Sequence, residues 1–281
     1  MNKNDELMMR FRREIFAPNG KREMTSTSDV DAGLANVILN VLNDVVVSDD
    51  RQSAKPLKQF LTRSPRDKLK IGQFDDVETF LRAMRTANGG RRDDENTSFS
   101  NVNADALPVL NLGRAPGFQL HDNSHATEDY NVGGITNADG KTVALLSLMP
   151  VEISYSIMVL ANEKETLSAL TGIIVGWLRQ FAAWGATHFE AKSQVAGASV
   201  VLECSLRDVK AVMINDLSGQ INDSRIYAAT IPITVIAPLY TAWLGEQKTG
   251  VIDVINNGVT YTTTAPGIPS ELPLNLFGEV V

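Results

Sequence analysis

The sequence predicts an α/β protein, in the broad sense that includes α+β, with a mixed, largely antiparallel sheet flanked by helices. Three observations lead to this prediction. Between residues 150 and 181, an alternation of apolar residues changes into the three-to-four spacing of a helix. A long alternating run follows at 225–237, and an Asn-Gly pair at 257–258 separates two strand-like runs near the C-terminus. Such a pair is typical of a β-hairpin.

Composition places the chain among ordinary globular proteins. Its 281 residues are 43% hydrophobic and carry a net charge of −7, so a global basic surface for nucleic acid is absent. The single cysteine, Cys204, excludes an intrachain disulfide and suits a reducing compartment. The N-terminus has no apolar signal-peptide region, and the most apolar run, 170–184, is too short to cross a bilayer. We therefore expect a soluble product of the cytoplasm with no membrane partner.

The N-terminal third predicts an arm followed by two helices. Residues 1–27 are polar with scattered apolar and arginine residues, which favours an arm that docks on a neighbouring subunit or stays loose. A membrane-surface or nucleic-acid arm is the alternative. Ser28–Val47 has a helical apolar spacing, with Ser28 and Asp31 as a capping box. Asp75–Arg85 predicts a second helix.

The middle of the chain alternates between loops and strands. A polar stretch at 91–102 predicts a surface loop, and Leu107–Arg114 predicts a strand. The Gly-, Asn- and Asp-rich stretch 115–140 predicts a long irregular loop, which in an assembly protein would often form an interface.

The second half is more regularly patterned. Strands are expected at 142–148 and 151–159, and then a helix that Asn162 caps together with Glu165. Its buried stripe comprises Leu167, Leu170, Ile173, Ile174, Trp177, Leu178 and Phe181. Further strands are expected at 186–191 and 199–206, whereas 207–220 is ambiguous between strand and short helix. Pro232 predicts that the strand 225–237 is an edge strand or carries a bulge.

The C-terminal part differs in character from the rest. After the hairpin at 257–258, a tail with three prolines has isolated apolar residues and is expected to lie in a groove of its own chain or of a partner. The predicted organisation is therefore an arm (1–27), an α/β domain (28–243) with the long loop 115–140, and a hairpin with an extended tail (244–281).

Motifs for chemistry are weak throughout. The strand–helix junction at 160–165 has two acids and no glycine, which argues against a phosphate site. His121 and His125 have a metal-compatible spacing around Asp122, but a surface loop is the favoured interpretation. No Gly-x-Ser-x-Gly motif is present, and Cys204 is most simply a core residue. We expect no catalytic, cofactor-binding or metal-binding residue, no cofactor and no enzymatic activity.

Three segments resemble the tail terminator, or neck, proteins of contractile-tailed bacteriophages. They are ALPVLNLGR (106–114), MPVEISYSIMVLANEKETLSALTGIIVGWLRQF (149–181) and VVLECSLRDVKAVMINDLSGQINDSRIYAATIPITVIAPLY (200–240), in this order. The resemblance covers roughly residues 106–243 and is one of pattern and order. The N-terminal third matches more loosely, and the C-terminal hairpin and tail have no counterpart in the pattern.

The resemblance implies a virion structural protein assembled in the host cytoplasm as a homohexameric ring. Such rings cap the tail tube and sheath and join the tail to the head–tail connector, with DNA passing through the lumen without specific binding. The implied fold is α/β and no cofactor is involved. The alternatives are another neck, tail-completion or head–tail joining protein, an intracellular enzyme with an unrecognised site, and a nucleic-acid-associated scaffold that uses the arginine-rich N-terminus.

A ring protein needs edge-to-edge surfaces rather than a pocket. Unpaired strand edges, a free hairpin and apolar-dotted tails are suited to strand addition between subunits. The candidate interface residues are Phe11, Arg12, Arg13, Glu163, Glu165, Asp223, Arg225, Val251, Ile255, Tyr261, Leu274 and Phe277.

Overall fold

The computed structural model describes residues 11–74, 76–87, 106–121, 129–183, 188–207, 212–221, 224–255 and 258–262. The chain forms two compact units. Unit 1 comprises residues 1–23, 131–147 and 242–281, and unit 2 comprises residues 24–130 and 148–241. The divisions fall within four strands, β1 (Phe11–Met24), β4 (Asp129–Thr136), β5 (Thr142–Ala161) and β10 (Ser224–Ile255).

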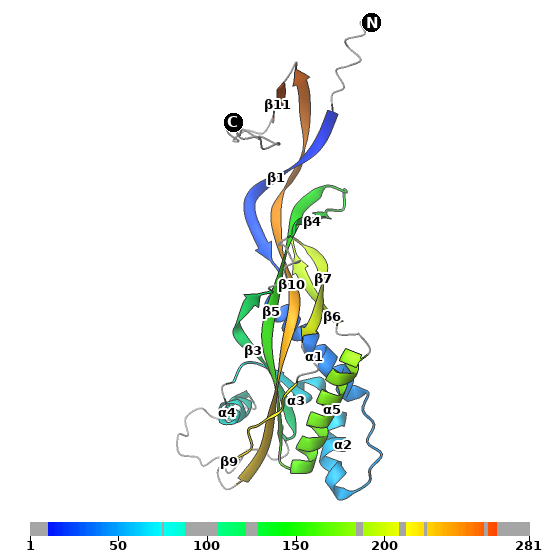
Figure 1. Cartoon of the computed structure of the whole chain (residues 1–281), viewed down its shortest axis with the longest axis vertical. Coiled ribbons are helices and arrows are strands. Elements are labelled where there is room, and N and C mark those ends of the chain that lie inside the picture. The colour runs from blue at the N-terminus through cyan, green and yellow to red at the C-terminus, as the bar shows by residue number, and fades with distance from the viewer. Residues whose placement is uncertain are drawn as a thin grey trace. The chain divides into compact units, whose positions relative to one another are not determined.

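The sheet of unit 2 is mixed and largely antiparallel, as predicted (Figure 1). Its strand order is β2–β3–β5–β10–β7–β6, with β2 at Leu69–Ile71, β3 at Val109–Leu120, β6 at His188–Val195 and β7 at Ala198–Arg207. β2 and β3 are parallel, whereas the pairs β3–β5, β7–β10 and β6–β7 are antiparallel.

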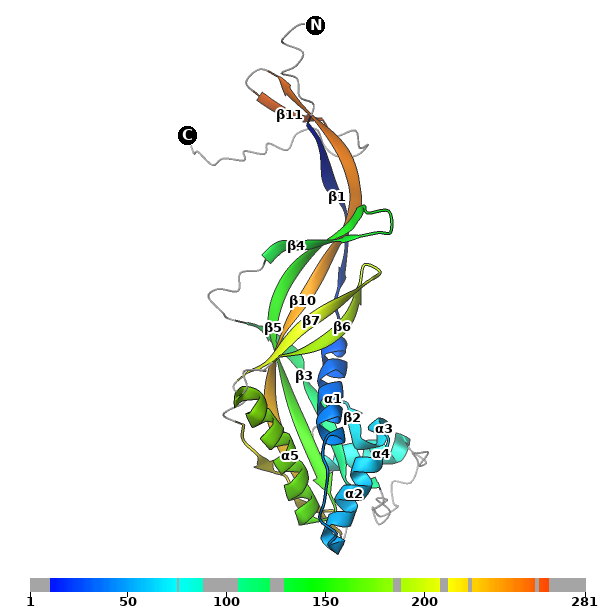
Figure 2. The ribbon, with the colours of Figure 1, turned by 90° about the vertical axis from the view of Figure 1, so that its right-hand side faces the viewer.

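Helices lie on both sides of this sheet. α1 (Thr27–Asn43), α2 (Lys55–Thr62) and α5 (Lys164–Ala183) lie on one side, and α4 (Val77–Ala87) lies on the other (Figures 1 and 2). Two short elements, η1 (Gln52–Ala54) and α3 (Pro65–Lys68), flank α2.

Alternation along β5 separates two apolar cores. Ile153 and Ile157 belong to the larger core with α1, α2 and α5, whereas Met158 and Leu160 belong to the smaller core with α4. Successive strand residues point to opposite faces, so one strand supplies both cores. Three residues of the predicted α5 stripe, Leu170, Ile174 and Leu178, are fully buried in the larger core.

The predicted helix caps are wrong at both long helices. Ser26 rather than Ser28 caps α1, because its Oγ accepts a hydrogen bond from the Ser28 N–H at 3.1 Å and its backbone is extended. Asp31 is buried and makes tertiary contacts instead of closing a capping box. α5 begins at Lys164, which puts Glu163 rather than Asn162 at the N-cap position.

The predicted long loop at 115–140 is also wrong in its described parts. β3 continues to Leu120, and β4 (Asp129–Thr136) pairs with β5. A tight turn joins β4 to β5, in which the Asn137 N–H donates to the Lys141 carbonyl at 2.9 Å and Gly140 has φ +76°. Most residues at the end of β3 are exposed, so an apolar alternation could not reveal the strand.

The two strands expected at 142–148 and 151–159 form one strand of 20 residues, with Pro150 inside it. The ambiguous segment after β7 contains two short strands, β8 (Asn215–Asp216) and β9 (Gly219–Ile221), which both pair with β10. Of the two predictions for that segment, strand or short helix, the strand is therefore the one found in its described part.

Pro232 predicts an edge strand or a bulge, and because β10 is an interior strand of the sheet, the edge alternative is wrong. Pro232 lies between the residues that pair with β7, beginning at Thr234, and those that pair with β8, ending at Thr230. Three residues of β10 (231–233) lie between these two pairings, whereas seven residues (208–214) lie between the paired residues of β7 and β8. The ladder is therefore irregular opposite the proline, which has no N–H to donate.

Unit 1 contains the predicted C-terminal hairpin. β10 pairs with β11 (Gly258–Thr262) in antiparallel register, with Val254 opposite Val259 and Ile255 opposite Gly258. In the same unit, the guanidinium carbon of Arg22 lies 3.8 Å from the centroid of the Trp243 ring, a cation–π contact. Of the expected arm (1–27), residues 11–24 form β1, which pairs with β10, whereas residues 1–10 and the tail 263–281 lie outside the described residues.

Candidate protein–protein interface

The predicted interface residues fall in both units. Those in described strands of unit 1 are Phe11, Arg12 and Arg13 in β1, Val251 and Ile255 in β10, and Tyr261 in β11. Tyr261 lies opposite Ile252 in the hairpin register. Asp223, Leu274 and Phe277 lie outside the described residues.

Three predicted residues lie in unit 2, at the end where α5 begins. Glu163 and Glu165 are exposed at the N-terminus of α5, where carboxylates are favoured by the helix dipole. Arg225 is exposed at the start of β10, with its guanidinium carbon 5.3 Å from the Tyr227 ring centroid. Three of the predicted interface residues therefore lie at one end of unit 2, where α5 and β10 begin.

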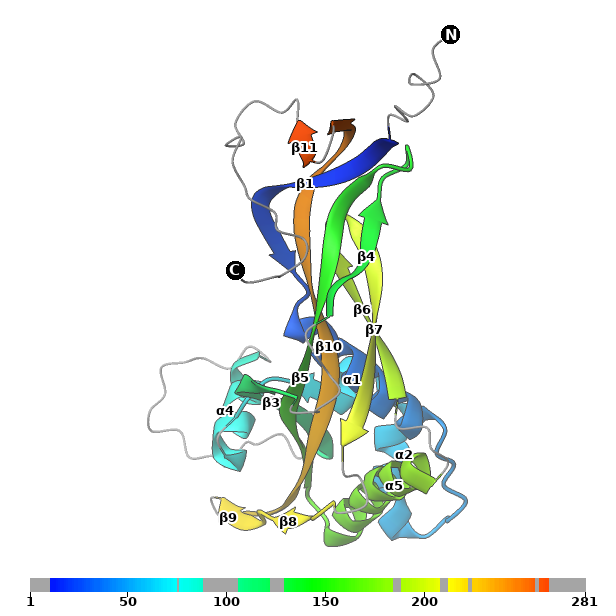
Figure 3. The same ribbon diagram turned by 45° about the horizontal axis from the view of Figure 1, so that its top comes forward.

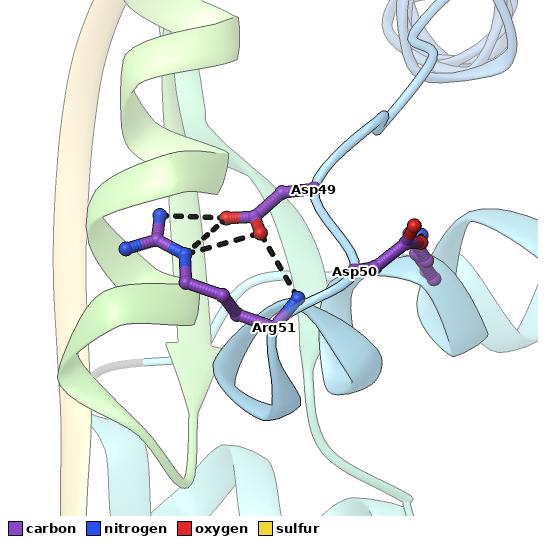
Figure 4. A network of polar contacts seen from close by, with 4 residues as sticks. Asp49, Asp50 and Arg51 are labelled. Carbon is purple, nitrogen blue, oxygen red and sulfur yellow. Dashed lines mark hydrogen bonds and ion pairs between the residues drawn. The ribbon is translucent and has the colours of Figure 1, made fainter.

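An arginine that the sequence patterns did not single out lies beside Glu165. Arg51 precedes η1, which packs against α5. Its Nη2 lies 2.6 Å from Asp49 Oδ2, and its backbone N–H donates to Asp49 Oδ1 at 3.0 Å (Figure 4). The hydrogen bonds that the Arg51 guanidinium donates to Asp49 raise the pKa of Arg51, and the negative charge of Glu165 contributes in the same direction.

The pKa of Asp49 is shifted in the opposite direction to that of Arg51. Hydrogen bonds from the Arg51 side chain and backbone lower the pKa of Asp49 to about 2. Next to it, Lys58 Nζ lies 2.8 Å from Asp50 Oδ1. Each of the two carboxylates therefore has a cationic partner.

Asp216 of β8 joins the same group of charges. Hydrogen bonds from Ser218 lower the pKa of Asp216, and the positive charges of Arg225 and Lys164 lower it further. We call these residues the charged rim: Asp49, Asp50, Arg51, Lys58, Lys164, Glu165, Asp216 and Arg225. The charged rim holds four carboxylates and four cations, so Glu165 of the acidic turn lies among compensating charges in the fold. A balanced rim of exposed charges suits recognition of a protein surface better than of a nucleic acid.

A second polar network crosses the face of the sheet. Glu152 of β5 accepts a hydrogen bond from Arg207 of β7 at 2.5 Å, and its Oε1 lies 2.6 Å from Nδ1 of His121, which directly follows β3. β10 lies between β5 and β7, so the Glu152–Arg207 pair bridges the central strand. The hydrogen bond with His121, followed by that with Arg207, lowers the pKa of Glu152 despite burial. The Glu152 carboxylate therefore links β5 to β7 and to the residue that follows β3.

A small hollow of about 220 Å³ lies beside this network. Its lining includes Ser154, Arg207, Val212, Pro232 and Thr234. It is too small for a typical ligand pocket of about 300–1,000 Å³.

His121 and Cys204, considered above for metal binding and nucleophilic chemistry, have structural roles. His121 pairs with Glu152, whereas Asp122 and His125 lie outside the described residues. Among the residues that the structure describes, no group of three or more His, Cys, Asp and Glu side chains could hold a metal ion. Cys204 is fully buried, and burial raises the pKa of its thiol to about 12, so it is a core residue. None of the described helices is long and apolar enough to cross a membrane.

The signal that could have identified the charged rim is the short run Asp49-Asp50-Arg51 between two helices. Its proximity to Glu165 depends on the packing of η1 on α5, which brings together partners more than a hundred residues apart in the sequence. Comparison of the sequence with protein-family models gives no match, and comparison with curated proteins gives no match either.

Proposed function

We propose that this protein is a virion structural protein, the tail terminator of a contractile-tailed bacteriophage. In this proposal six copies form a ring that caps the tail tube and sheath and meets the head–tail connector. DNA passes through the lumen of the ring without specific binding. The observation that carries the proposal is the order of three sequence segments that resemble such terminators.

The elements formed by these segments support the proposal. The first segment contributes β3, the second forms the end of β5 and then α5, and the third spans β7, β8, β9 and most of the unit 2 part of β10. All three meet in one sheet, because β3, β5, β10 and β7 are successive neighbours. The resembling region thus forms a contiguous part of unit 2 rather than scattered pieces.

The charged rim supports a role in assembly. Exposed ion pairs contribute little to the stability of a fold, typically about 0–1 kcal/mol each. Complementary charges do, however, orient partners and exclude wrong ones. A rim that contains Arg51, Glu165 and Asp216 is therefore a suitable surface for the tail tube protein, the sheath protein or a neighbouring subunit.

The proposal is tested by adding the purified protein to polymerising tail tubes and measuring tube length by electron microscopy. A terminator binds one tube end and stops growth, so tubes become shorter as the ratio of protein to tube subunits rises. The variant Glu165→Lys should weaken capping, since it reverses a charge of the charged rim beside Arg51. Glu190→Lys, an exposed acid on β6 outside the charged rim, is the matched control.

Unchanged tube growth at every ratio, with no protein at tube ends, would contradict the proposal. If the Glu190→Lys control weakened capping equally, the role of the charged rim would be contradicted, but the proposed terminator function would not.

A further inference from the structure

An apolar groove lies between α1 and α5. Its volume is about 770 Å³, within the range of cavities that bind ligands or side chains of a partner. Val37, Val41 and Val45 line it from the α1 side, and Ile173 and Trp177 line it from α5. Phe189 adds a sixth large apolar side chain, whereas Asn40, Asp44, Gln180 and His188 contribute the polar part of the lining, so the groove is suited to an apolar side chain with polar groups around it.

Two glycines leave room on the α5 side of the groove. Gly172 and Gly176 are one turn apart on α5, and a Cβ atom added to either would meet nothing within 4 Å. Residues four apart share one helix face, so the pair forms a shallow notch opposite the α1 valines. Glycine costs a helix interior about 1 kcal/mol relative to alanine, so this pair is unfavourable for α5 alone.

An apolar knob lies elsewhere on the same unit. Met213, Ile214 and Leu217 are 68%, 50% and 42% exposed, three large apolar side chains within five residues. The backbone is anchored at the Leu217 end of the knob, because the Leu217 N–H donates to the Ala228 carbonyl at 2.9 Å and Asp216 pairs with Ala229 of β10. Exposed apolar side chains on an ordered backbone commonly mark a contact surface.

We propose that the knob of one copy inserts into the α1–α5 groove of the next copy. This inference rests on the proposed ring and assigns one of its subunit contacts. The knob belongs to the segment along the lower end of β10, whereas the groove belongs to α1 and α5 (Figure 3). Each copy therefore offers one donor and one acceptor surface, and a head-to-tail contact of this kind generates a ring when its rotation closes.

Cross-linking tests the contact directly. Ile214→Cys places a thiol on the knob, and Gly176→Cys places one in the groove, where the structure has space for it. The native Cys204 does not compete, since it is buried. Each variant is treated with a short bis-maleimide, as full-length protein, alone and assembled on tail tubes.

A head-to-tail contact predicts three results. Either single variant alone gives no cross-linked dimer, a mixture of the two gives dimers only, and the double variant gives a ladder that ends at six copies. As a second measurement, Gly176→Leu fills the groove and should raise the dissociation constant of the ring about tenfold or more, whereas Gly176→Ala should change it less than about twofold.

The outcomes separate this inference from the proposed function. An oligomer that forms without a cross-link between the Ile214→Cys and Gly176→Cys variants overturns the knob-and-groove contact but leaves the ring intact. A double variant that yields dimers and no higher species overturns the head-to-tail arrangement. A protein that stays monomeric even with tail tubes overturns both proposals.

Discussion

Tyr155 donates its phenolic hydrogen to Asp31 Oδ1 across 2.7 Å, which joins the middle of β5 to the first turns of α1. The two residues are 124 positions apart, and both are buried. Arg114 of β3 completes the cluster, with its Nε 3.0 Å from the same carboxylate oxygen. α1 is therefore fixed to two neighbouring strands by one charged side chain.

Replacing Tyr155 with phenylalanine should lower the free energy of unfolding by about 1.5–3 kcal/mol. A hydrogen bond to a charged group is lost, and the buried Asp31 then keeps only Arg114. Urea unfolding measures the change. Tyr240→Phe is the matched control and should cost less than about 0.5 kcal/mol, because no hydrogen bond of its hydroxyl group is seen among the described residues. Equal losses in the two variants would contradict this role of Tyr155.

Alkaline pH should destabilise the protein through the same tyrosine. Burial first, and then the hydrogen bond to Asp31, raise the pKa of Tyr155 well above its ordinary value of 10. Above about pH 10 the unfolded chain releases this proton while the folded protein keeps it, so the free energy of unfolding falls as pH rises.

The Tyr155→Phe variant isolates this effect from the other groups that titrate there. Cys204 acts in the same direction, since burial raises its pKa, whereas burial lowers the pKa of Lys68. The difference in stability between native protein and variant should therefore shrink from about pH 9 to about pH 12. A constant difference over this range would contradict the assignment.

Acid should weaken the Glu152–Arg207 pair, which bridges β10. The pKa of Glu152 is lowered chiefly by the hydrogen bond with His121, so its contribution is present above the ordinary value of 4.5 and is lost as pH falls through the lowered value. Glu152→Gln should cost about 1 kcal/mol near neutral pH, after discounting for the partly exposed Arg207. It should also flatten the acid limb of stability measured by urea unfolding. Glu203→Gln is the control and should leave that limb unchanged, because no hydrogen bond or ion pair of the Glu203 carboxylate is found within the described part of the chain.

Replacing each of two helical glycines with alanine should change the stability of the protein in opposite directions. A Cβ at Gly33 of α1 would lie 2.7 Å from the Ala191 Cβ of β6, so Gly33→Ala should destabilise by about 1–3 kcal/mol despite its higher helix propensity. Gly176→Ala meets open space and should stabilise by up to about 1 kcal/mol. Thermal unfolding of the two variants measures both signs, and a stabilising Gly33→Ala would show that α1 does not approach β6 so closely.

The sequence predicts well those elements whose pattern follows from local burial. β5 is recognisable where buried and less buried residues alternate, at 151–157, and α5 because one face is buried, as Ile153, Ile157, Leu170 and Leu178 show. Prediction fails where burial does not alternate. The end of β3 is exposed, β4 is rich in glycine, and Pro232 lies in an interior strand at an irregularity of the ladder.

The candidate interface could be predicted only in part. Glu163, Glu165 and Arg225 are correctly placed on the surface, because charged residues at helix and strand starts are normally exposed. Arg51 and Asp216 could not be associated with them, since their proximity to α5 arises from tertiary packing. The groove and the knob could not be recognised either, because each reads locally as ordinary apolar sequence.

The proposed ring is tested most directly by measuring the mass of the purified protein, alone and after mixing with tail tubes. A terminator should give a species of six copies, free in solution or bound at tube ends. A protein of 30.6 kDa that stays a stable monomer and does not bind tubes would contradict the proposal.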